Sequence, residues 1–277
     1  MTSAAPRPDE SDPRRWYSTN LVGVPTGVLA SPEYNRHAQP LAITGTRETH
    51  PGLFALLAGC ADAAATAEVF EHYMEVAFGL GRPDPDAAPA ERRRHRSSYL
   101  KLLQGWGIES NDPPGAVLKG WVESRFGLVP TFHKAALGRF PSPAWVAYLE
   151  EKAGSRFHNN CINLQIDLLY EYCQWTLARF APLGPSPVRL WRGSNRCEEQ
   201  VVSGALRARR CVMRMNNLVS FSLTRERAET FGDWILEADV PAPKILFYPG
   251  LLRGRVLNGE GEVIAIGGDY DVRTAYL

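Results

Sequence analysis

Apolar side chains recur at helical spacing along most of the first 180 residues. In residues 53–79, alanine, leucine and aromatic residues follow one another three or four positions apart. This period predicts one helix that ends at Gly79 and Gly81. Comparable patterns and end signals predict further helices over residues 91–104, 114–126, 142–154 and 160–180.

The period of the pattern changes after residue 181. Pro182, Gly184, Pro185 and Pro187 interrupt the helical spacing, and beyond them apolar and polar residues alternate. Alternation with a period of two is typical of strands. We expect one short helix at about 225–232, and strands at 188–192, 217–222, 234–239, 244–248, 262–266 and 271–276.

A helical half followed by a series of short strands predicts an α+β fold. We expect a flexible arm at 1–20 and a mainly helical region at 21–187. The helical region is expected to pack on a β-rich core at 188–277, with a mixed or antiparallel sheet, in one integrated domain.

Composition excludes several classes of partner. The 277 residues carry a net charge of +1, which gives no reason to expect nucleic acid as a partner. No uncharged apolar run approaches the roughly 18 residues that span a bilayer, so no membrane span is expected. The N-terminus lacks the apolar segment of a secretory signal, and we expect a cytoplasmic protein.

The five cysteines show no Cys-x-x-Cys pair and no spacing with histidine that is typical of zinc sites. We therefore expect reduced thiols and no bound metal. Basic clusters at 92–96 and 207–214 fit a solvated surface, docking to an acidic protein surface, or binding of nucleic acid, and no nucleic-acid motif supports the last of these.

The first candidate for chemistry is Arg192, which ends a predicted strand and is followed by Gly193. A guanidinium is planar, permanently charged and matched in geometry to phosphate oxygens. The glycine allows a ligand to approach the backbone closely. Taken alone, the pair also fits a surface arginine at a strand end.

The second candidate is the pair Ser220 and Ser222, with Phe221 between them. In a strand the two serines face one side and Phe221 faces the other. Their small hydroxyls leave room for a ligand and can orient a neighbouring carboxylate by hydrogen bonding. An ordinary strand with polar alternation is the alternative.

The third candidate is the pair Glu260 and Glu262, which flank Gly261 before an apolar strand. At positions i and i+2 of a strand start, the two carboxylates project to the same side. Acidic groups this close shift each other's pKa unless a cation lies between them. A substrate guanidinium or a cationic ribose transition state is such a cation. Two solvated acids in a glycine-rich turn are the alternative.

In this order, the three motifs can hold a pyrophosphate, a nicotinamide ribose and a cationic acceptor in one cleft. The set resembles the Arg-Ser-Glu signature of arginine-specific mono-ADP-ribosyltransferases, most clearly over residues 188–277. With its helical first half, the whole chain is most similar to the dinitrogenase reductase ADP-ribosyltransferase family of nitrogen-fixing bacteria. The serine motif here is Ser-Phe-Ser instead of Ser-Thr-Ser, and the two outer hydroxyls remain.

The resemblance implies a sandwich-like catalytic core that binds NAD as a co-substrate. Arg192 would bind the pyrophosphate or the nearby ribose, and the Gly193 backbone would bind the nicotinamide carboxamide. Ser222 would belong to the same NAD-binding set, and Phe231 would support the nicotinamide pocket.

The resemblance also assigns the catalytic groups. Glu262 would be the catalytic carboxylate, positioned by Ser220, and Glu260 would orient and deprotonate the target guanidinium. The loop 249–259 would face the protein substrate.

The implied reaction moves ADP-ribose from NAD to an arginine of dinitrogenase reductase, the nitrogenase iron protein, and so stops nitrogen fixation. Regulation by a PII-type nitrogen-signalling protein is implied by the family alone. Two alternatives stay open from the residues: a related transferase with another protein target, and a catalytically weak NAD-binding protein that acts by docking. Intact acids at Glu260 and Glu262 argue against the second.

Overall fold

The computed structural model describes residues 20–81, 97–254, 256–257 and 261–277. Two predictions fall on residues outside this description: the arm expected at 1–20, except for residue 20, and residues 91–96 of the helix expected at 91–104. The described helices are α1 (Thr26–Leu29), α2 (Pro32–Arg36), α3 (Thr46–Thr49), α4 (Pro51–Ala58), α5 (Ala63–Phe78), α7 (Tyr99–Ile108), α8 (Pro113–Phe126), α9 (Pro143–Gly154), α10 (Asn160–Phe180) and α11 (Arg225–Ala228).

The strands form one large antiparallel sheet and one small pair. The pair consists of β1 (Phe132–His133) and β2 (Ala135–Ala136). The large sheet contains β3 (Val188–Ser194), β4 (Val201–Ala205), β5 (Arg210–Ser222), β6 (Trp234–Val240), β7 (Ile245–Phe247) and β8 (Glu262–Tyr276). The α+β prediction is confirmed, while the sandwich-like packing of the core stays a prediction.

The sheet bends over itself because β5 and β8 are long strands that pair along most of their length. Strand β8 also pairs with β6, β6 pairs with β3, and β3 returns to β5 at the contact of Trp191 with Ser222. The pairings therefore close a ring of four strands. This ring brings the start of β8 and the end of β5 next to β3.

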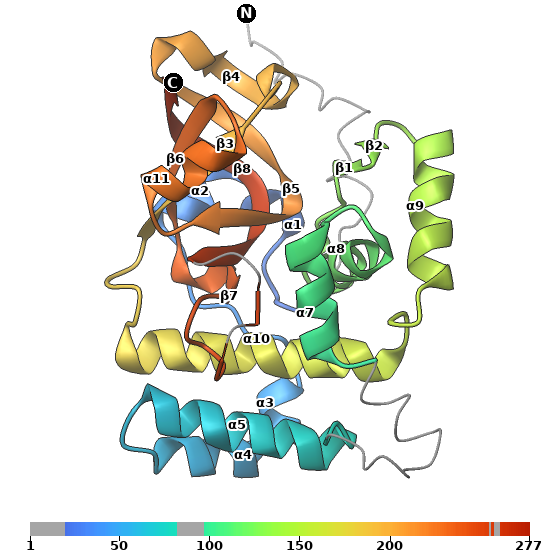
Figure 1. Cartoon of the computed structure of the whole chain (residues 1–277), viewed down its shortest axis with the longest axis vertical. Coiled ribbons are helices and arrows are strands. Elements are labelled where there is room, and N and C mark those ends of the chain that lie inside the picture. The colour runs from blue at the N-terminus through green and yellow to red at the C-terminus, as the bar shows by residue number, and fades with distance from the viewer. Residues whose placement is uncertain (1–19, 82–96, 255, 258–260) are drawn as a thin grey trace, which may run out of the picture.

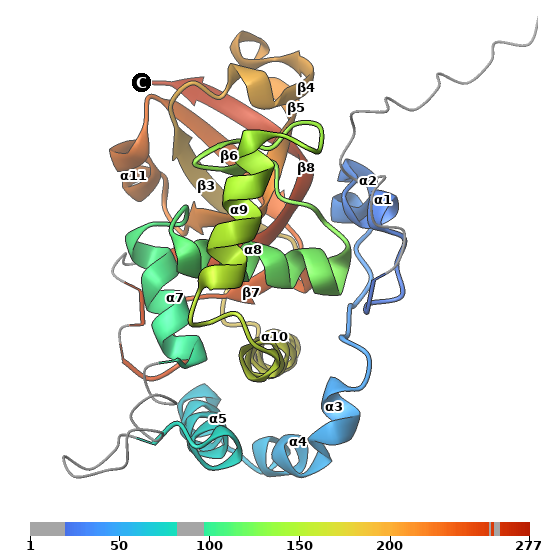
Figure 2. The same ribbon diagram turned by 90° about the vertical axis from the view of Figure 1, so that its right-hand side faces the viewer.

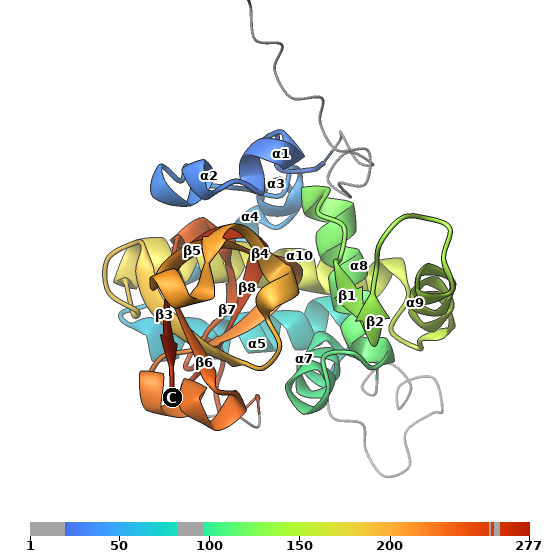
Figure 3. The ribbon, with the colours of Figure 1, turned by 90° about the horizontal axis from the view of Figure 1, so that it is seen from above.

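The helices surround the sheet on several sides. The longest helix, α10, runs under the sheet, and α4 and α5 lie on the far side of α10 (Figure 1 and Figure 2). Helices α7, α8 and α9 cover one flank, and α1 and α2 lie at another edge (Figure 3). One continuous apolar core joins α5, α7, α8 and α10 to the strands. Within it, the rings of Phe70 and Tyr172 stack with centroids 4.1 Å apart.

The predicted helix over 53–79 is wrong in one respect, since it consists of two helices. Helix α4 ends at Ala58, and α5 begins only at Ala63. The Asp62 carboxylate accepts the Ala65 N–H at 2.8 Å and so starts a new helix. Helices α8, α9 and α10 lie where the sequence predicts them, and Ser142 caps α9 in the expected way.

The predicted strands 262–266 and 271–276 are one strand, β8. The sequence suggests a break at Gly267 and Gly268, but these glycines lie where other backbone passes close by. A Cβ on Gly267 would lie 1.6 Å from the Asn216 carbonyl oxygen. Gly268 has a φ of +107° and packs on the Ala30 carbonyl. The strand thus continues through a bulge, where the register with β5 also shifts.

Among the described residues, no helix combines the length and apolar character needed to cross a bilayer.

Candidate active site

The strand register brings the three sequence motifs together. Ser222, the last residue of β5, pairs with Glu262, the first residue of β8, and also with Trp191 of β3. Arg192 follows Trp191 directly. Residues that are 28 and 42 positions apart in the chain therefore meet at one end of the ring of strands.

A short hydrogen bond joins the second and third motifs. The Ser220 hydroxyl donates to Glu262 Oε1 at 2.6 Å. Arg192 Nη1 donates to the Ser220 backbone carbonyl at 2.8 Å. The arginine is thereby attached to the strand that carries the serine, and the serine orients the carboxylate.

Helix α7 adds a residue that the sequence analysis missed. The indole Nε1–H of Trp106 donates to Ser220 Oγ at 2.9 Å. Trp106 is only 3% exposed, and a buried indole N–H needs an acceptor. The one hint in the sequence is a tryptophan between two glycines, Gly105 and Gly107, just after the predicted helix at 91–104. That pattern does not reveal a partner in a strand more than a hundred residues away.

These residues line a cavity of about 600 Å³. This volume lies in the range of roughly 300–1,000 Å³ that is usual for small-molecule sites. Residues of β3, β5 and β8 line the cavity together with the end of α7, Arg227 and Phe231. The lining includes all the described residues predicted for the site: Arg192, Gly193, Ser220, Ser222, Phe231 and Glu262.

Gly193 is required by the close approach of α11 to β3. A Cβ at this position would lie 2.0 Å from the Ala228 carbonyl oxygen. The side chain of Thr224 accepts the Arg227 N–H at 3.3 Å and so starts α11 next to the cavity. The glycine therefore sets the distance between the strand and the segment that carries Arg227 and Phe231.

The remaining predicted residues differ in exposure. Ser222 is 7% exposed and Phe231 is 59% exposed, although both line the cavity. An exposed aromatic ring at the margin of a cavity is free to pack against a planar ligand. Phe221, predicted to face away from the serines, is buried and its ring lies near that of Tyr270.

Glu260 lies outside the described residues. The position of its neighbour Gly261 is described, with a φ of +78°. The Gly261 carbonyl accepts the Leu223 N–H at 2.9 Å, which attaches the Glu-Gly-Glu motif to the segment after Ser222. The role predicted for Glu260 therefore stays a prediction from the sequence.

The electrostatics of the site depend on Glu262 and Arg192. Burial is the largest influence on Glu262 and raises its pKa, against the hydrogen bond from Ser220 and the positive charge of Arg192. Burial lowers the pKa of Arg192, against the negative charge of Glu262. Because a guanidinium stays protonated even after such a shift, the site pairs a permanent cation with a poorly solvated carboxylate.

Within the described ranges, no three histidine, cysteine or acidic side chains lie close enough to hold a metal ion.

Comparison with known proteins gives this site a context. The family model of dinitrogenase reductase ADP-ribosyltransferases matches residues 19–274. This chain belongs to that family. A relative from Rhodospirillum rubrum, described as NAD(+)--dinitrogen-reductase ADP-D-ribosyltransferase, is 50% identical over 271 residues. The match covers 97% of this chain and 98% of the relative. No solved structure matches the chain.

Membership of the dinitrogenase reductase ADP-ribosyltransferase family accounts for the helical first half as well as the strands, because the match begins at residue 19. The helices therefore belong to the family's shared architecture. In this chain they supply Trp106 and part of the cavity lining.

Proposed function

We propose that this chain transfers ADP-ribose from NAD to an arginine side chain of dinitrogenase reductase and releases nicotinamide. The structural observation that supports this proposal is the Ser220–Glu262 hydrogen bond, which lies in the same cavity as Arg192. The 50% identity with a relative whose name states this activity supports the choice of substrate.

The cavity suits a dinucleotide in a particular orientation. The Arg192 guanidinium would bind the pyrophosphate or the adjoining ribose, since it offers several donors to anionic oxygens. The Gly193 backbone would bind the nicotinamide carboxamide, with Phe231 packing near the ring and Ser222 completing the pocket. This places the nicotinamide ribose next to Glu262.

The first half of the reaction breaks the bond between the ribose carbon and the pyridinium nitrogen of NAD. Nicotinamide leaves with the bonding electrons as a neutral base, so a strong general acid is unnecessary. Positive charge develops on the ribose, as in glycoside hydrolysis. The Glu262 carboxylate, aimed by Ser220, would stabilise that charge and hold a ribose hydroxyl.

The second half forms a bond between the same ribose carbon and a guanidino nitrogen of the target arginine. A protonated guanidinium is a poor nucleophile. Glu260 would accept its proton as the bond forms and pass it to solvent. The loop 249–259, which leads to this residue, would face the protein substrate.

The test is transfer of labelled ADP-ribose from NAD to purified dinitrogenase reductase, with the Glu262→Gln variant in parallel. We expect label on an arginine with the natural chain, and a loss of roughly 10²–10³ in rate or more in the variant. Nicotinamide release that depends on Glu262, without label on dinitrogenase reductase, would keep the chemistry and replace the protein target. Absence of both activities would contradict the proposal.

Regulation of the reaction by a PII-type protein stays a prediction from the family resemblance, and a cytoplasmic location stays a prediction from the sequence.

A further inference from the structure

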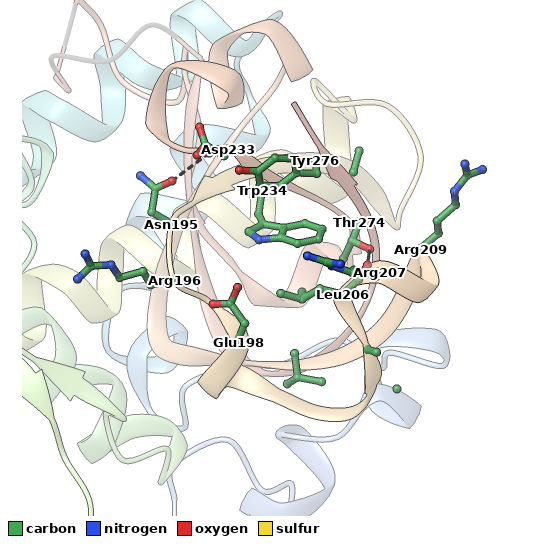
Figure 4. A pocket seen from close by; sticks show the side chains of 14 residues that line it. Asn195, Arg196, Glu198, Leu206, Arg207, Arg209, Asp233, Trp234, Thr274 and Tyr276 are labelled. Carbon is green, nitrogen blue, oxygen red and sulfur yellow. Dashed lines mark hydrogen bonds between the residues drawn. The ribbon is translucent and has the colours of Figure 1, made fainter.

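A second and larger cavity opens beside the candidate active site. Its volume is about 1580 Å³, and it lies between β4 and the ends of β6 and β8 (Figure 4). We refer to it as the β4 groove. The side chains that matter for its chemistry are Asn195, Arg196, Arg207, Arg209, Trp234 and Tyr276.

The β4 groove is adjacent to the active-site cavity. Asn195, directly after β3, lines both. Its Oδ1 accepts the Asp233 N–H at 3.0 Å, which fixes the side chain between the two spaces. A protein bound in the groove would therefore lie next to the active-site cavity.

The groove is lined by basic side chains. Arg207 and Arg209 are exposed and form no ion pair with any other residue in the described part of the chain. Glu198 and Asp233 line other parts of the groove, and Figure 4 shows them away from Arg209. The two guanidinium groups are thus available for acidic groups of a partner.

The groove also exposes aromatic surface. The ring of Tyr276 meets that of Trp234 edge to face, with centroids 5.0 Å apart, and Tyr276 is 63% exposed. Figure 4 shows the indole in the middle of the groove with Arg207 beside it. Tyrosine, tryptophan and arginine are the residues most enriched where proteins bind one another.

Backbone conformation adds an independent observation. Arg196 and Arg209 both have a positive φ, at 50° and 62°, although neither is a glycine. This region is unfavourable for residues with a Cβ, and such conformations cluster at functional sites. Here they lie at opposite margins of the same groove (Figure 4).

We propose that the β4 groove docks the protein substrate of the transfer reaction, through an acidic segment beside its target arginine. The inference rests on the proposed function. A stable contact with a folded protein needs about 800 Å² on each partner, which a small catalytic cavity does not provide. The groove is adjacent to that cavity, wide, and lined by aromatic and basic side chains, which suits a protein surface.

The test separates the protein acceptor from a small one. The double variant Arg207→Glu/Arg209→Glu is assayed with dinitrogenase reductase and with agmatine, a small guanidino compound, at varied NAD. We expect KM for the protein to rise about tenfold or more, with kcat for agmatine and KM for NAD unchanged. Added salt should raise KM for the protein in the natural chain more than in the variant.

Two further variants make the result specific. Arg139→Glu reverses an exposed arginine that lines neither cavity and should leave every parameter unchanged. Tyr276→Ala removes an exposed ring and should raise KM for the protein without affecting agmatine.

Several outcomes would overturn the docking role. An unchanged KM for the protein would show that the groove does not bind it. A raised KM for NAD with either acceptor would show that the groove holds part of the dinucleotide instead. In both cases the natural chain still labels dinitrogenase reductase. If the natural chain fails to label it, the proposed function falls as well, so the two failures are distinguishable.

Discussion

The indole N–H of Trp106 lies 2.9 Å from the hydroxyl oxygen of Ser220, although 114 positions separate the two residues. An indole N–H can only donate, so Ser220 Oγ accepts this hydrogen bond. The serine's own hydrogen is then directed to Glu262, at 2.6 Å. The helical half of the chain thus fixes the direction of a hydrogen bond in the strand half.

Trp106 is therefore expected to act as a positioning residue. Trp106→Phe removes the donor and keeps an aromatic ring, and kcat should fall about tenfold, in line with one hydrogen bond of roughly 1–1.5 kcal/mol. The nearby Trp106 N–H also lowers the pKa of Glu262, so in the variant the acid limb of the pH profile should move to higher pH. KM for NAD should change little.

A double-mutant cycle distinguishes positioning from a general loss of packing. Trp106→Phe should have little further effect in a Ser220→Ala background, because the relay is already interrupted. Fully additive losses, with an unshifted pH profile, would assign Trp106 a packing role only. Thermal unfolding of each variant verifies that the fold is retained.

The two acids of the third motif should have separable roles. Glu260→Gln should lose transfer to arginine and keep some NAD hydrolysis, since water does not need the deprotonation that a guanidinium needs. Glu262→Gln should lose both, because charge on the ribose develops in either reaction. Parallel assays of nicotinamide release and arginine labelling measure the two activities. An equal loss of both in the Glu260 variant would contradict this division.

Gly193→Ala should distort the edge of the active-site cavity, where α11 packs on β3. The new methyl group would lie 2.0 Å from the Ala228 carbonyl, so α11 must move away from β3. Crowding of this kind costs about 1–3 kcal/mol of unfolding free energy. Because Phe231 follows on the same segment, KM for NAD should also rise. Gly138→Ala, at an exposed position with no atom close to the added methyl, is the matched control.

Much of the architecture is predictable from local patterns. The N-cap serine, the proline after it and the apolar spacing define α9 and α10 within a residue or two. The glycine pair in β8 is misleading, because the chain beside it, at Asn216 and Ala30, comes from distant parts of the sequence. A glycine that permits close packing and a glycine that ends a strand look the same in one sequence.

The candidate site likewise contains residues that the sequence identifies and one residue whose role only the fold reveals. Arg192, Ser220 and Glu262 are recognisable because their residue types and order match a known chemistry. Trp106 is not, since its role arises only when α7 packs against the end of β5. Tertiary contacts of this kind leave no period or spacing in the sequence.

The burial of Glu262 predicts a dependence of stability on pH. Its pKa is raised in the folded chain, so folding disfavours its charged form. The free energy of unfolding should then decrease as pH rises from the ordinary pKa of about 4.3 through the raised pKa. At neutral pH the whole of this loss of stability is present. Glu262→Gln should therefore unfold at a higher temperature than the natural chain at pH 7.

The higher unfolding temperature of Glu262→Gln should disappear below about pH 4, where the Glu262 carboxyl of the natural chain is protonated in both the folded and the unfolded state. A gain that is the same at pH 4 and pH 7 would exclude the charge of Glu262 as its cause. Calorimetric scans over this range provide the measurement.

Lys244 predicts a second pH dependence, of opposite sign. Its side chain is fully buried, with Nζ 3.1 Å from the Gly267 carbonyl and 4.7 Å from the ring centroid of Tyr270. Burial lowers its pKa to about 7. In the range from pH 7 to the ordinary value of about 10.4, the unfolded chain binds more protons, so stability should rise with pH.

Lys244→Met removes the titrating group and keeps its length. The free energy of unfolding of the variant should exceed that of the natural chain most below pH 7, where the buried ammonium is charged. This difference should shrink towards pH 10. Lys101→Met, at an exposed position, is the surface control. Denaturant titrations at pH 6, 8 and 9.5 measure the effect. A difference for Lys244→Met that stays constant over this range would mean that Lys244 keeps its ordinary pKa in the folded chain.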